Sequence, residues 1–165
     1  MARVEFGNGM VSTIGELPPV GRKAPDSLLV DENLKSVQLS EITGRKILNI
    51  FPSIGTGVCQ SQVRAFSKLA GQLGDTKVLN ISLDLPFAMI QFCGAEGIEN
   101  AANYSTFRGD FAVDYGVKFL EGGFEGLCSR SIVVIDAAGI VIYTEQVPAT
   151  GQEPDYKALL AALDA

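Results

Sequence analysis

The most informative absence from this sequence of 165 residues is histidine, which does not occur at all. Cysteine hydrolases and acyltransferases need an imidazole to accept and return a proton, and histidine is also the commonest metal ligand. Cysteine is scarce too: the chain has Cys59, Cys93 and Cys128, whose wide spacing lacks the close ligand pairs of a structural zinc site. We therefore expect no metal or other cofactor, and we expect any cysteine chemistry to be thiolate redox chemistry.

The chain also lacks a concentration of positive charge and a long apolar run. Its 13 basic and 19 acidic residues give a net charge of -6, without the basic patch that attracts nucleic acid. No segment approaches the roughly 20 apolar residues of a membrane span, and the first residues hold no apolar run of signal-peptide length. We expect a soluble, cytoplasmic protein that binds neither nucleic acid nor membrane. In the cytoplasm, disulfides tend to be transient and catalytic.

The pattern of apolar residues predicts a single α/β domain over residues 1–165. Short extended runs at 3–6 and 10–14 flank Gly7-Asn8-Gly9, a strong turn signal, and predict a hairpin extension within residues 1–20. The later predicted elements are extended segments at 27–30 and 37–39, a buried strand at 46–51, a helix from 58 to a cap at Gly74, a strand at 78–83, a short helix at 87–92, a glycine-rich loop at 116–126, strands at 130–135 and 140–145, and a helix at 155–163. This order favours a thioredoxin-like fold with a mixed central sheet flanked by helices.

Cys59 lies in the first turn of the predicted helix, a position that favours the thiolate. Lowering a thiol pKa from about 8.5 to about 6 requires roughly 3.4 kcal/mol of selective stabilisation of the anion. The unpaired N–H groups and dipole of a helix N-terminus usually supply only about 0.3 to 2 kcal/mol. A nearby cation is therefore needed. In the absence of histidine, the first candidate is Arg130, which opens a predicted strand, and the second is Arg64 on the helix.

The segment before Cys59 has the form PxxxTxxC, with Pro52 and Thr56 at the fixed positions. A hydroxyl three residues before the cysteine can donate or accept a hydrogen bond beside the thiolate, while the proline fixes φ and shields one side of the pocket. Thr56 also suits the start of a helix as a capping residue, and the two roles are compatible. Such a pocket suits a small polar oxidant.

At these residues the sequence resembles the thiol peroxidases, a branch of the peroxiredoxin family with two redox cysteines in one chain. The matching stretches are Asn49-Ile50-Phe51-Pro52-Ser53-Ile54 leading to Thr56 and Cys59, Asp84-Leu85-Pro86-Phe87-Ala88 leading to Phe92-Cys93-Gly94-Ala95-Glu96-Gly97, Ser105-Thr106-Phe107-Arg108, Arg130 with Val133-Val134-Ile135-Asp136, and Glu153-Pro154-Asp155-Tyr156. The chain differs from the family pattern at Gly55 and Gln91, where an acidic and a basic residue are usual, and at Cys128, where a small residue is usual.

The resemblance implies an antioxidant enzyme, a thioredoxin-dependent peroxidase that reduces hydrogen peroxide and organic hydroperoxides. It implies that Cys59 is the peroxidatic cysteine, which becomes a sulfenic acid, and that Cys93 resolves it through an intrachain disulfide. It further implies that Pro52, Thr56 and Arg130 line the peroxide pocket, and that the protein is a homodimer reduced by thioredoxin or a similar dithiol. Cys128 is expected to be inert, because a lone cysteine is most often a small apolar core residue.

Two other functions remain open from the sequence. A disulfide oxidoreductase on the same fold would pass electrons between thiols without peroxide, but the CxxC pair usual in that class is absent. A redox-sensing protein would report oxidation without turnover. Rapid steady-state consumption of peroxide in the presence of a reducing system would distinguish an enzyme from such a sensor.

Overall fold

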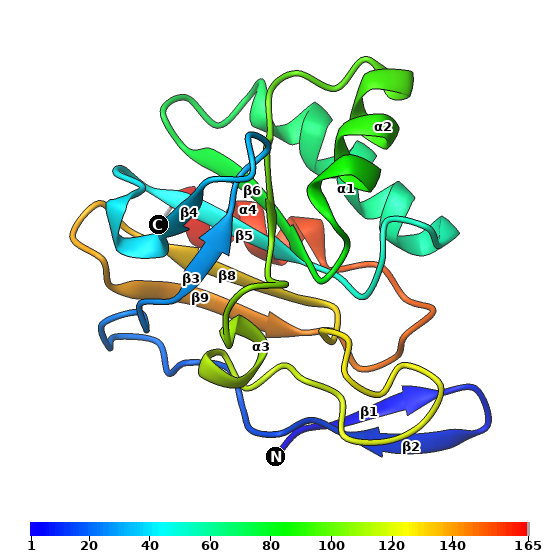
Figure 1. Ribbon diagram of the computed structural model, residues 1–165. Coiled ribbons are helices and arrows are strands. Elements are labelled where there is room, and N and C mark those ends of the chain that lie inside the picture. Colours follow the sequence, from blue (N-terminus) through cyan, green and yellow to red (C-terminus); the bar gives the residue numbers. More distant parts are fainter. Residues whose placement is uncertain (165) are drawn as a thin grey trace.

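The computed structural model describes residues 1–164 and contains two sheets (Figure 1). The smaller sheet is an N-terminal hairpin, in which β1 (Arg3–Phe6) pairs antiparallel with β2 (Gly9–Ser12). Its turn places Gly7 at a φ of 59°, a left-handed conformation that glycine adopts without a steric penalty. The predicted hairpin is confirmed.

The larger sheet has seven strands in the order β4-β3-β7-β6-β5-β8-β9. Its strands are β3 (Leu28–Val30), β4 (Ser36–Gln38), β5 (Lys46–Ile50), β6 (Lys77–Ser82), β7 (Ala102–Ser105), β8 (Ser131–Ile135) and β9 (Val141–Gln146). The neighbours β5, β6 and β7 run parallel, and the other pairs run antiparallel. The sheet is mixed, and the predicted thioredoxin-like fold is confirmed.

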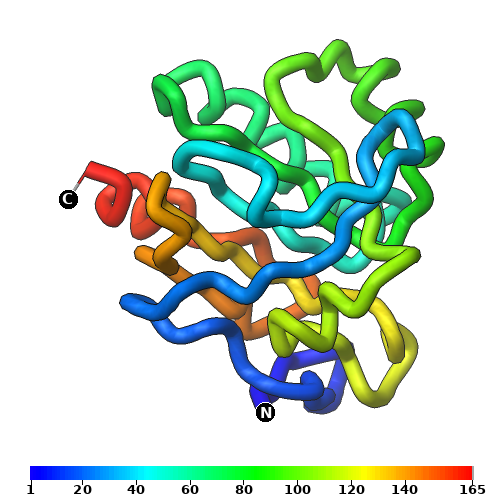
Figure 2. Tube along the Cα trace, turned by 60° about the vertical axis from the view of Figure 1, so that its left-hand side comes forward, coloured from blue at the N-terminus to red at the C-terminus, as the bar shows by residue number. Residues whose placement is uncertain are grey.

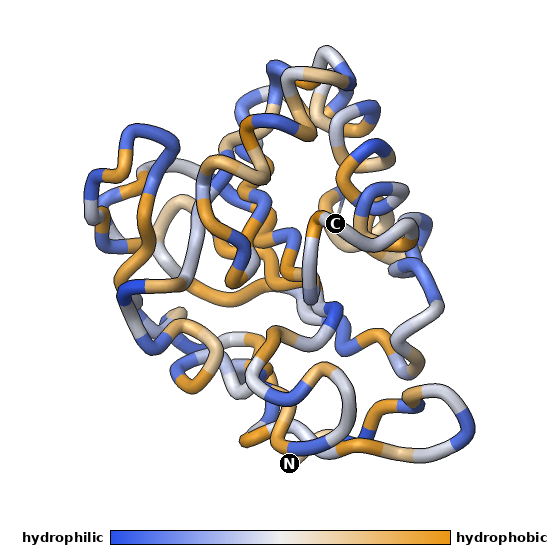
Figure 3. Tube along the Cα trace, turned by 45° about the vertical axis from the view of Figure 1, so that its right-hand side comes forward, coloured by the Kyte–Doolittle hydropathy of each residue, from blue (hydrophilic) through white to orange (hydrophobic). Residues whose placement is uncertain are grey.

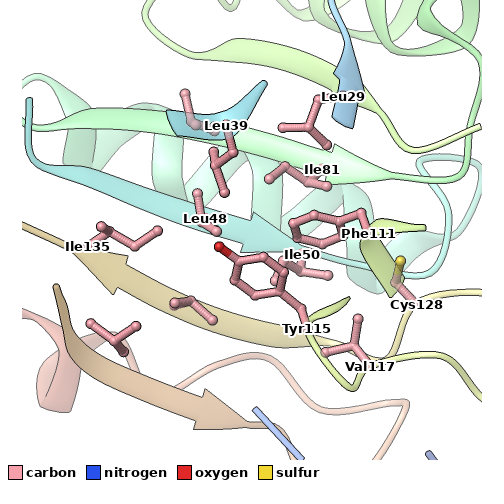
Figure 4. Close-up of a cluster of buried hydrophobic side chains, with 13 residues drawn as sticks. Leu29, Leu39, Leu48, Ile50, Ile81, Phe111, Tyr115, Val117, Cys128 and Ile135 are labelled. Carbon is pink, nitrogen blue, oxygen red and sulfur yellow. The ribbon is translucent and has the colours of Figure 1, made fainter. Parts of the chain in front are cut away.

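Helices cover both faces of this sheet. They are the 3-10 turn η1 (Leu39–Glu41) and the α-helices α1 (Gly57–Ala70), α2 (Pro86–Glu96), α3 (Phe111–Asp114) and α4 (Tyr156–Asp164). Phe66 of α1 and Leu159 of α4 pack with Ile47 on one face, while Phe111 and Tyr115 stack over the other (Figure 4). Hydrophobic residues accordingly concentrate along the central strands (Figure 3), and all five residues of β5 are buried. No helix within residues 1–164 is long and apolar enough to cross a membrane.

The hairpin packs against the loop that precedes β8, as Figure 2 shows at the bottom of the molecule. Val4 and Val11 form a small core with Phe119, and Thr13 pairs with Phe119 in an isolated bridge. Gly116 lies so close to the chain after the hairpin that a Cβ there would be 2.2 Å from the carbonyl oxygen of Glu16. The hairpin is therefore attached to the loop that leads to Arg130.

The structure corrects the predicted ends of two helices. Helix α1 ends at Ala70 rather than near Gly74, because Leu73 continues the apolar pattern from a turn, where it packs against the core without being helical. Helix α2 runs four residues beyond the predicted end at Phe92, and Gly97 terminates it in a left-handed conformation. The amides of Gly97 and Ile98 donate to the carbonyls of Gly94 and Cys93, which is a Schellman cap. Cys93 therefore lies inside the helix.

Three elements were not predicted at all: η1, β7 and α3. Strand β7 reads Ala-Asn-Tyr-Ser, which has neither β-branched residues nor an apolar alternation. Its place in the sheet comes from parallel pairing with β6 over residues 102–105. Helix α3 has only four residues, too short for a helical period to be visible in the sequence.

Candidate active site

The loop between β5 and α1 is held by a carboxylate from the neighbouring strand end. Asp84, just after β6, accepts hydrogen bonds from the hydroxyl of Ser53 (2.9 Å) and from the backbone amide of Ile54 (2.7 Å). The hydroxyl of Ser82 donates to the same carboxylate at 2.7 Å. Because β5 and β6 are parallel, their carboxyl ends meet at one edge of the sheet, and this contact fixes the turn that starts α1.

Cys59 lies in the first turn of α1 and is fully buried. A guanidinium nitrogen of Arg130, Nη1, donates to its sulfur at 3.3 Å. Arg130 comes directly before β8, which pairs with β5, so the antiparallel pairing of these strands brings a residue 71 positions away to the thiol. A helix N-terminus and an arginine together stabilise a thiolate, and thiolate is the nucleophilic form of cysteine.

Three atoms surround the guanidinium of Arg130, which is only 3% exposed. Nη1 donates to the side-chain oxygen of Gln62 at 2.8 Å as well as to Cys59, and Nη2 donates to the carbonyl of Thr150 at 2.8 Å. These two oxygen acceptors fix the plane of the guanidinium and the direction of its remaining N–H groups. Nε is buried and has no hydrogen-bond partner among the described residues.

Thr56 and Pro52 flank the cysteine as the motif predicts, although Thr56 bonds differently from expectation. Thr56 occupies the N-cap position of α1, yet its hydroxyl makes no capping bond and donates to the carbonyl of Ser53 at 3.2 Å. With its proton used in this way, the hydroxyl oxygen can only accept a further hydrogen bond. Pro52 is buried two residues after the end of β5.

The second candidate cation, Arg64, is engaged elsewhere. Its guanidinium makes a bidentate salt bridge with the Glu96 carboxylate on α2, with N–O distances of 3.0 and 2.9 Å. The guanidinium carbon lies 5.4 Å from the ring centre of Phe92. The Arg64 side chain is 42% exposed, and the hydrogen bonds that it donates to Glu96 raise its pKa. Arg64 therefore links α1 to α2, and Arg130 is the cation at the thiol.

Cys93 belongs to the same buried cluster as Cys59, between α1 and α2. The cluster also contains Phe51, Val63 and Met89. Burial raises the pKa of the Cys93 thiol, an amide hydrogen bond from Asn103 at 3.5 Å opposes this rise, and the charge of Glu32 adds to it. Both cysteines are free thiols in this structure. The arrangement places two thiols in one apolar compartment, only one of which is paired with a cation.

Cys128 lies on the other side of the sheet, in the cluster drawn in Figure 4. Complete burial raises the pKa of this thiol to about 12, and the negative charge of Asp84 adds to the rise. A thiol with such a pKa remains protonated at physiological pH. Its environment is that of a core residue.

Sequence reasoning missed the polar groups that support Arg130 and Cys93. Gln62 follows Cys59 by less than one helical turn, and only the packing of α1 on the sheet reveals that it faces inward. Thr150 contributes a backbone carbonyl, which carries no residue signal. Asn49 and Asn80 did offer a signal, because each interrupts an apolar run, and the two are partners in the register of β5 and β6.

Comparison with known proteins identifies the family. A family model described as Redoxin matches residues 19–160. A thiol peroxidase of Mycobacterium tuberculosis is 48% identical over 166 residues, which covers the whole of both chains. The chain belongs to the thiol peroxidases of the redoxin family. A thiol peroxidase of Corynebacterium glutamicum is 46% identical over 99% of this chain and all of its own length.

Solved structures agree with this assignment. A thiol peroxidase from Chromobacterium violaceum superposes with a TM-score of 0.92 at 27% identity, covering 98% of this chain and 95% of that chain. A peroxiredoxin-like protein from Aquifex aeolicus gives a TM-score of 0.88 at 28% identity, again over 98% of this chain and 95% of that one. This member of the thiol peroxidases is therefore an enzyme, a peroxidase of the peroxiredoxin type.

Proposed function

We propose that Cys59 is the peroxidatic cysteine and reduces hydrogen peroxide and organic hydroperoxides. The contact of Arg130 Nη1 with the Cys59 sulfur, at 3.3 Å in the first turn of α1, carries this proposal. The thiolate attacks the terminal oxygen of the hydroperoxide, the O–O bond breaks, and the departing oxygen takes up a proton to become water or an alcohol. Cys59 is left as a sulfenic acid.

Thr56 supplies the complementary contact to the peroxide. Since its hydroxyl already donates to Ser53, its oxygen accepts a hydrogen bond from the O–H of the hydroperoxide, while Arg130 donates to the oxygen atoms as negative charge develops on them. Pro52 closes the pocket on one side. A donor and an acceptor on either side of the O–O bond align it with the sulfur.

Thr56→Val is expected to slow peroxide attack about tenfold, because it replaces the accepting oxygen with a methyl group of similar size and loses one hydrogen bond in the transition state. Thr56→Ser, which keeps the oxygen, is the matched control and is expected to stay close to wild type. Stopped-flow measurement of the single-turnover oxidation rate compares the three proteins. Equal rates for all three proteins would mean that Thr56 has only a structural role at the start of α1.

Cys93 resolves the sulfenic acid in our proposal. Its thiol condenses with the Cys59 sulfenic acid, forming the disulfide and releasing water. A disulfide requires Cα atoms within about 7 Å, and Cys93 is held inside α2 by helical bonds and by the cap at Gly97. The end of α2 and the start of α1 must loosen for the sulfurs to meet, and the exposed Arg64–Glu96 pair between these helices separates in that motion.

The experiment that tests this proposal is intact-mass analysis after one equivalent of peroxide. The wild-type chain is expected to lose two hydrogens, whereas Cys93→Ser is expected to gain oxygen and then stop, because the resolving thiol is missing. Sustained thioredoxin-dependent turnover by Cys93→Ser would refute the two-cysteine cycle. In that case a mixed disulfide with the reductant, or a pairing with Cys128, would have to explain the return to the reduced state.

Thioredoxin or a similar dithiol completes the proposed cycle in the cytoplasm, by exchange with the Cys59–Cys93 disulfide. We further propose a homodimer. Exposed apolar side chains gather at the start of α2 and around α3, among them Phe87, which is 62% exposed, with Leu85, Phe107 and Val113. Exposed apolar groups of this size favour burial in a protein interface. Sedimentation as a monomer at micromolar concentration would rule the homodimer out.

A further inference from the structure

A line of buried carboxamides crosses the sheet beneath α1 and α2. Asn49 on β5, Asn80 on β6 and Asn103 on β7 are direct register partners in the parallel strands, so their side chains project from the same face. All three are buried, at 0%, 1% and 4% exposure. Buried polar groups require hydrogen bonds, and these amides supply them to one another.

The amides join end to end, and the line runs from one charged group to another. Arg130 donates to Gln62, which donates to Asn49; Asn49 donates to Asn80 at 2.9 Å, Asn80 to Asn103 at 3.0 Å, and Asn103 to the carboxylate of Glu32 at 2.8 Å. We call Gln62, Asn49, Asn80, Asn103 and Glu32 the amide chain. It starts at the guanidinium that contacts Cys59, and its last amide, Asn103, also donates to Cys93.

The two charged ends determine the direction of every amide between them. A guanidinium has only donors, so Gln62 must turn its oxygen towards Arg130. A carboxylate has only acceptors, so Asn103 must turn its nitrogen towards Glu32. Each intermediate amide then receives a bond on oxygen and gives one from nitrogen, and such head-to-tail bonds strengthen one another. A reversed chain would present an N–H group of Gln62 to the cation.

We propose that Asn49, Asn80, Asn103 and Glu32 are positioning residues for the peroxidatic cysteine, which hold Gln62, and through it Arg130, in the orientation that directs an N–H group at the Cys59 sulfur. The proposal rests on the function proposed above for Cys59. Gln62 and the Thr150 carbonyl fix the guanidinium plane, and the amide chain fixes Gln62. Glu32 lies in the turn between β3 and β4, so an exposed residue on the far side of β7 contributes to the site.

The test uses Glu32 because it is exposed, and its replacement leaves the core intact. Glu32→Ala removes the terminal acceptor, whereas Glu32→Gln keeps an acceptor oxygen and loses only the charge. Glu41→Ala, at an exposed position in η1 outside the amide chain, controls for the change in net charge. Each substitution is made in a Cys93→Ser, Cys128→Ala background, so that alkylation and oxidation report on Cys59 alone.

The sign of the effect separates positioning from simple electrostatics. If Glu32 acted only through its charge, its removal would stabilise a thiolate and move the alkylation curve of Cys59 to lower pH. We expect Glu32→Ala to move the curve to higher pH and to slow single-turnover peroxide reduction about threefold, because a less ordered chain directs Arg130 less well. Glu32→Gln is expected to restore most of the rate, and Glu41→Ala to match the background protein.

Asn80→Leu gives a second, larger effect at the centre of the chain. The side chain of Asn80 hydrogen-bonds to Asn49 and Asn103 and to neither cysteine, and leucine of similar size interrupts the amide chain while leaving both ends in place. We expect about a tenfold loss in the rate of Cys59 oxidation, together with the shift of the alkylation curve to higher pH. If this variant fails to fold, the Glu32 variants alone test the proposal.

The proposal is overturned if the curve for Glu32→Ala stays in place or moves to lower pH, or if Glu32→Gln behaves like Glu32→Ala. The series leaves unchanged Arg130, Asp84 on the loop before α2, the Arg64–Glu96 pair and Tyr156, whose hydroxyl interacts electrostatically with Arg130, while Cys93 is replaced in the background of every variant. Alkylation involves no peroxide, so it reports the placement of Arg130 even if the peroxidase cycle proposed for Cys59 proves wrong.

Discussion

Peroxide consumption is expected to vanish in Cys59→Ser and to continue at the wild-type rate in Cys128→Ala. A serine hydroxyl stays protonated near neutral pH and is a poor nucleophile towards oxygen, so neither the helix N-terminus nor Arg130 can rescue it. Cys128 is fully buried with its pKa raised to about 12, on the opposite face of the sheet, and takes no part in turnover. The assay is steady-state peroxide consumption with thioredoxin and its reductase.

Alanine is chosen at Cys128 because a serine there would place a hydroxyl in an apolar cluster. Turnover by Cys59→Ser above trace level would show that another thiol is the peroxidatic cysteine. A large loss in Cys128→Ala with an unchanged melting temperature would show that this buried thiol participates after all.

Arg130→Ala is expected to lower the single-turnover rate of peroxide reduction by a factor on the order of 10² to 10³, the effect of losing one pre-oriented donor in a buried site. It is also expected to move the alkylation curve of Cys59 to higher pH, since the helix N-terminus alone supplies too little stabilisation of the anion. Little change is expected in the melting temperature, because the contacts that are lost belong to the site rather than to the main hydrophobic core.

Two further variants sharpen this result. Arg130→Lys keeps the charge but cannot reach Cys59, Gln62 and Thr150 together from one planar group, so it is expected to recover only part of the rate. Arg64→Ala removes an arginine from the same helix as Cys59 and leaves the first oxidation step unchanged. An alkylation curve for Arg130→Ala that coincides with wild type would remove Arg130 from the mechanism.

The parts of the fold that could be predicted are those with a strong local period. The run at 46–51 is mostly apolar because β5 is covered on both faces, and the three- and four-residue steps after Val58 reflect the side of α1 that packs on the sheet. The short strand β7 could not be predicted, because pairing with β6 rather than its own composition makes it a strand.

The same division applies to the site. Cys59 and Arg130 could be proposed from the sequence because anion stabilisation at a helix start requires a cation and only a few arginines lie near buried strands. The amide chain could not, because it depends on the register of three strands and on which face Gln62 takes in α1. The position of Cys93 within α2 was likewise hidden, since the glycine that ends this helix is Gly97 and not Gly94.

The N-terminal hairpin has a consequence for the order in which the site is completed during synthesis. Glu5 of β1 donates its amide to the carbonyl of Pro148 and accepts from the amide of Thr150, and the carbonyl of Thr150 in turn holds Arg130. Strand β1 therefore cannot complete these contacts until Pro148 and Thr150 have been synthesised. Cys59 and Cys93 leave the ribosome well before Arg130 and Thr150, so a nascent chain carries both thiols before the cation that contacts Cys59 is held in place.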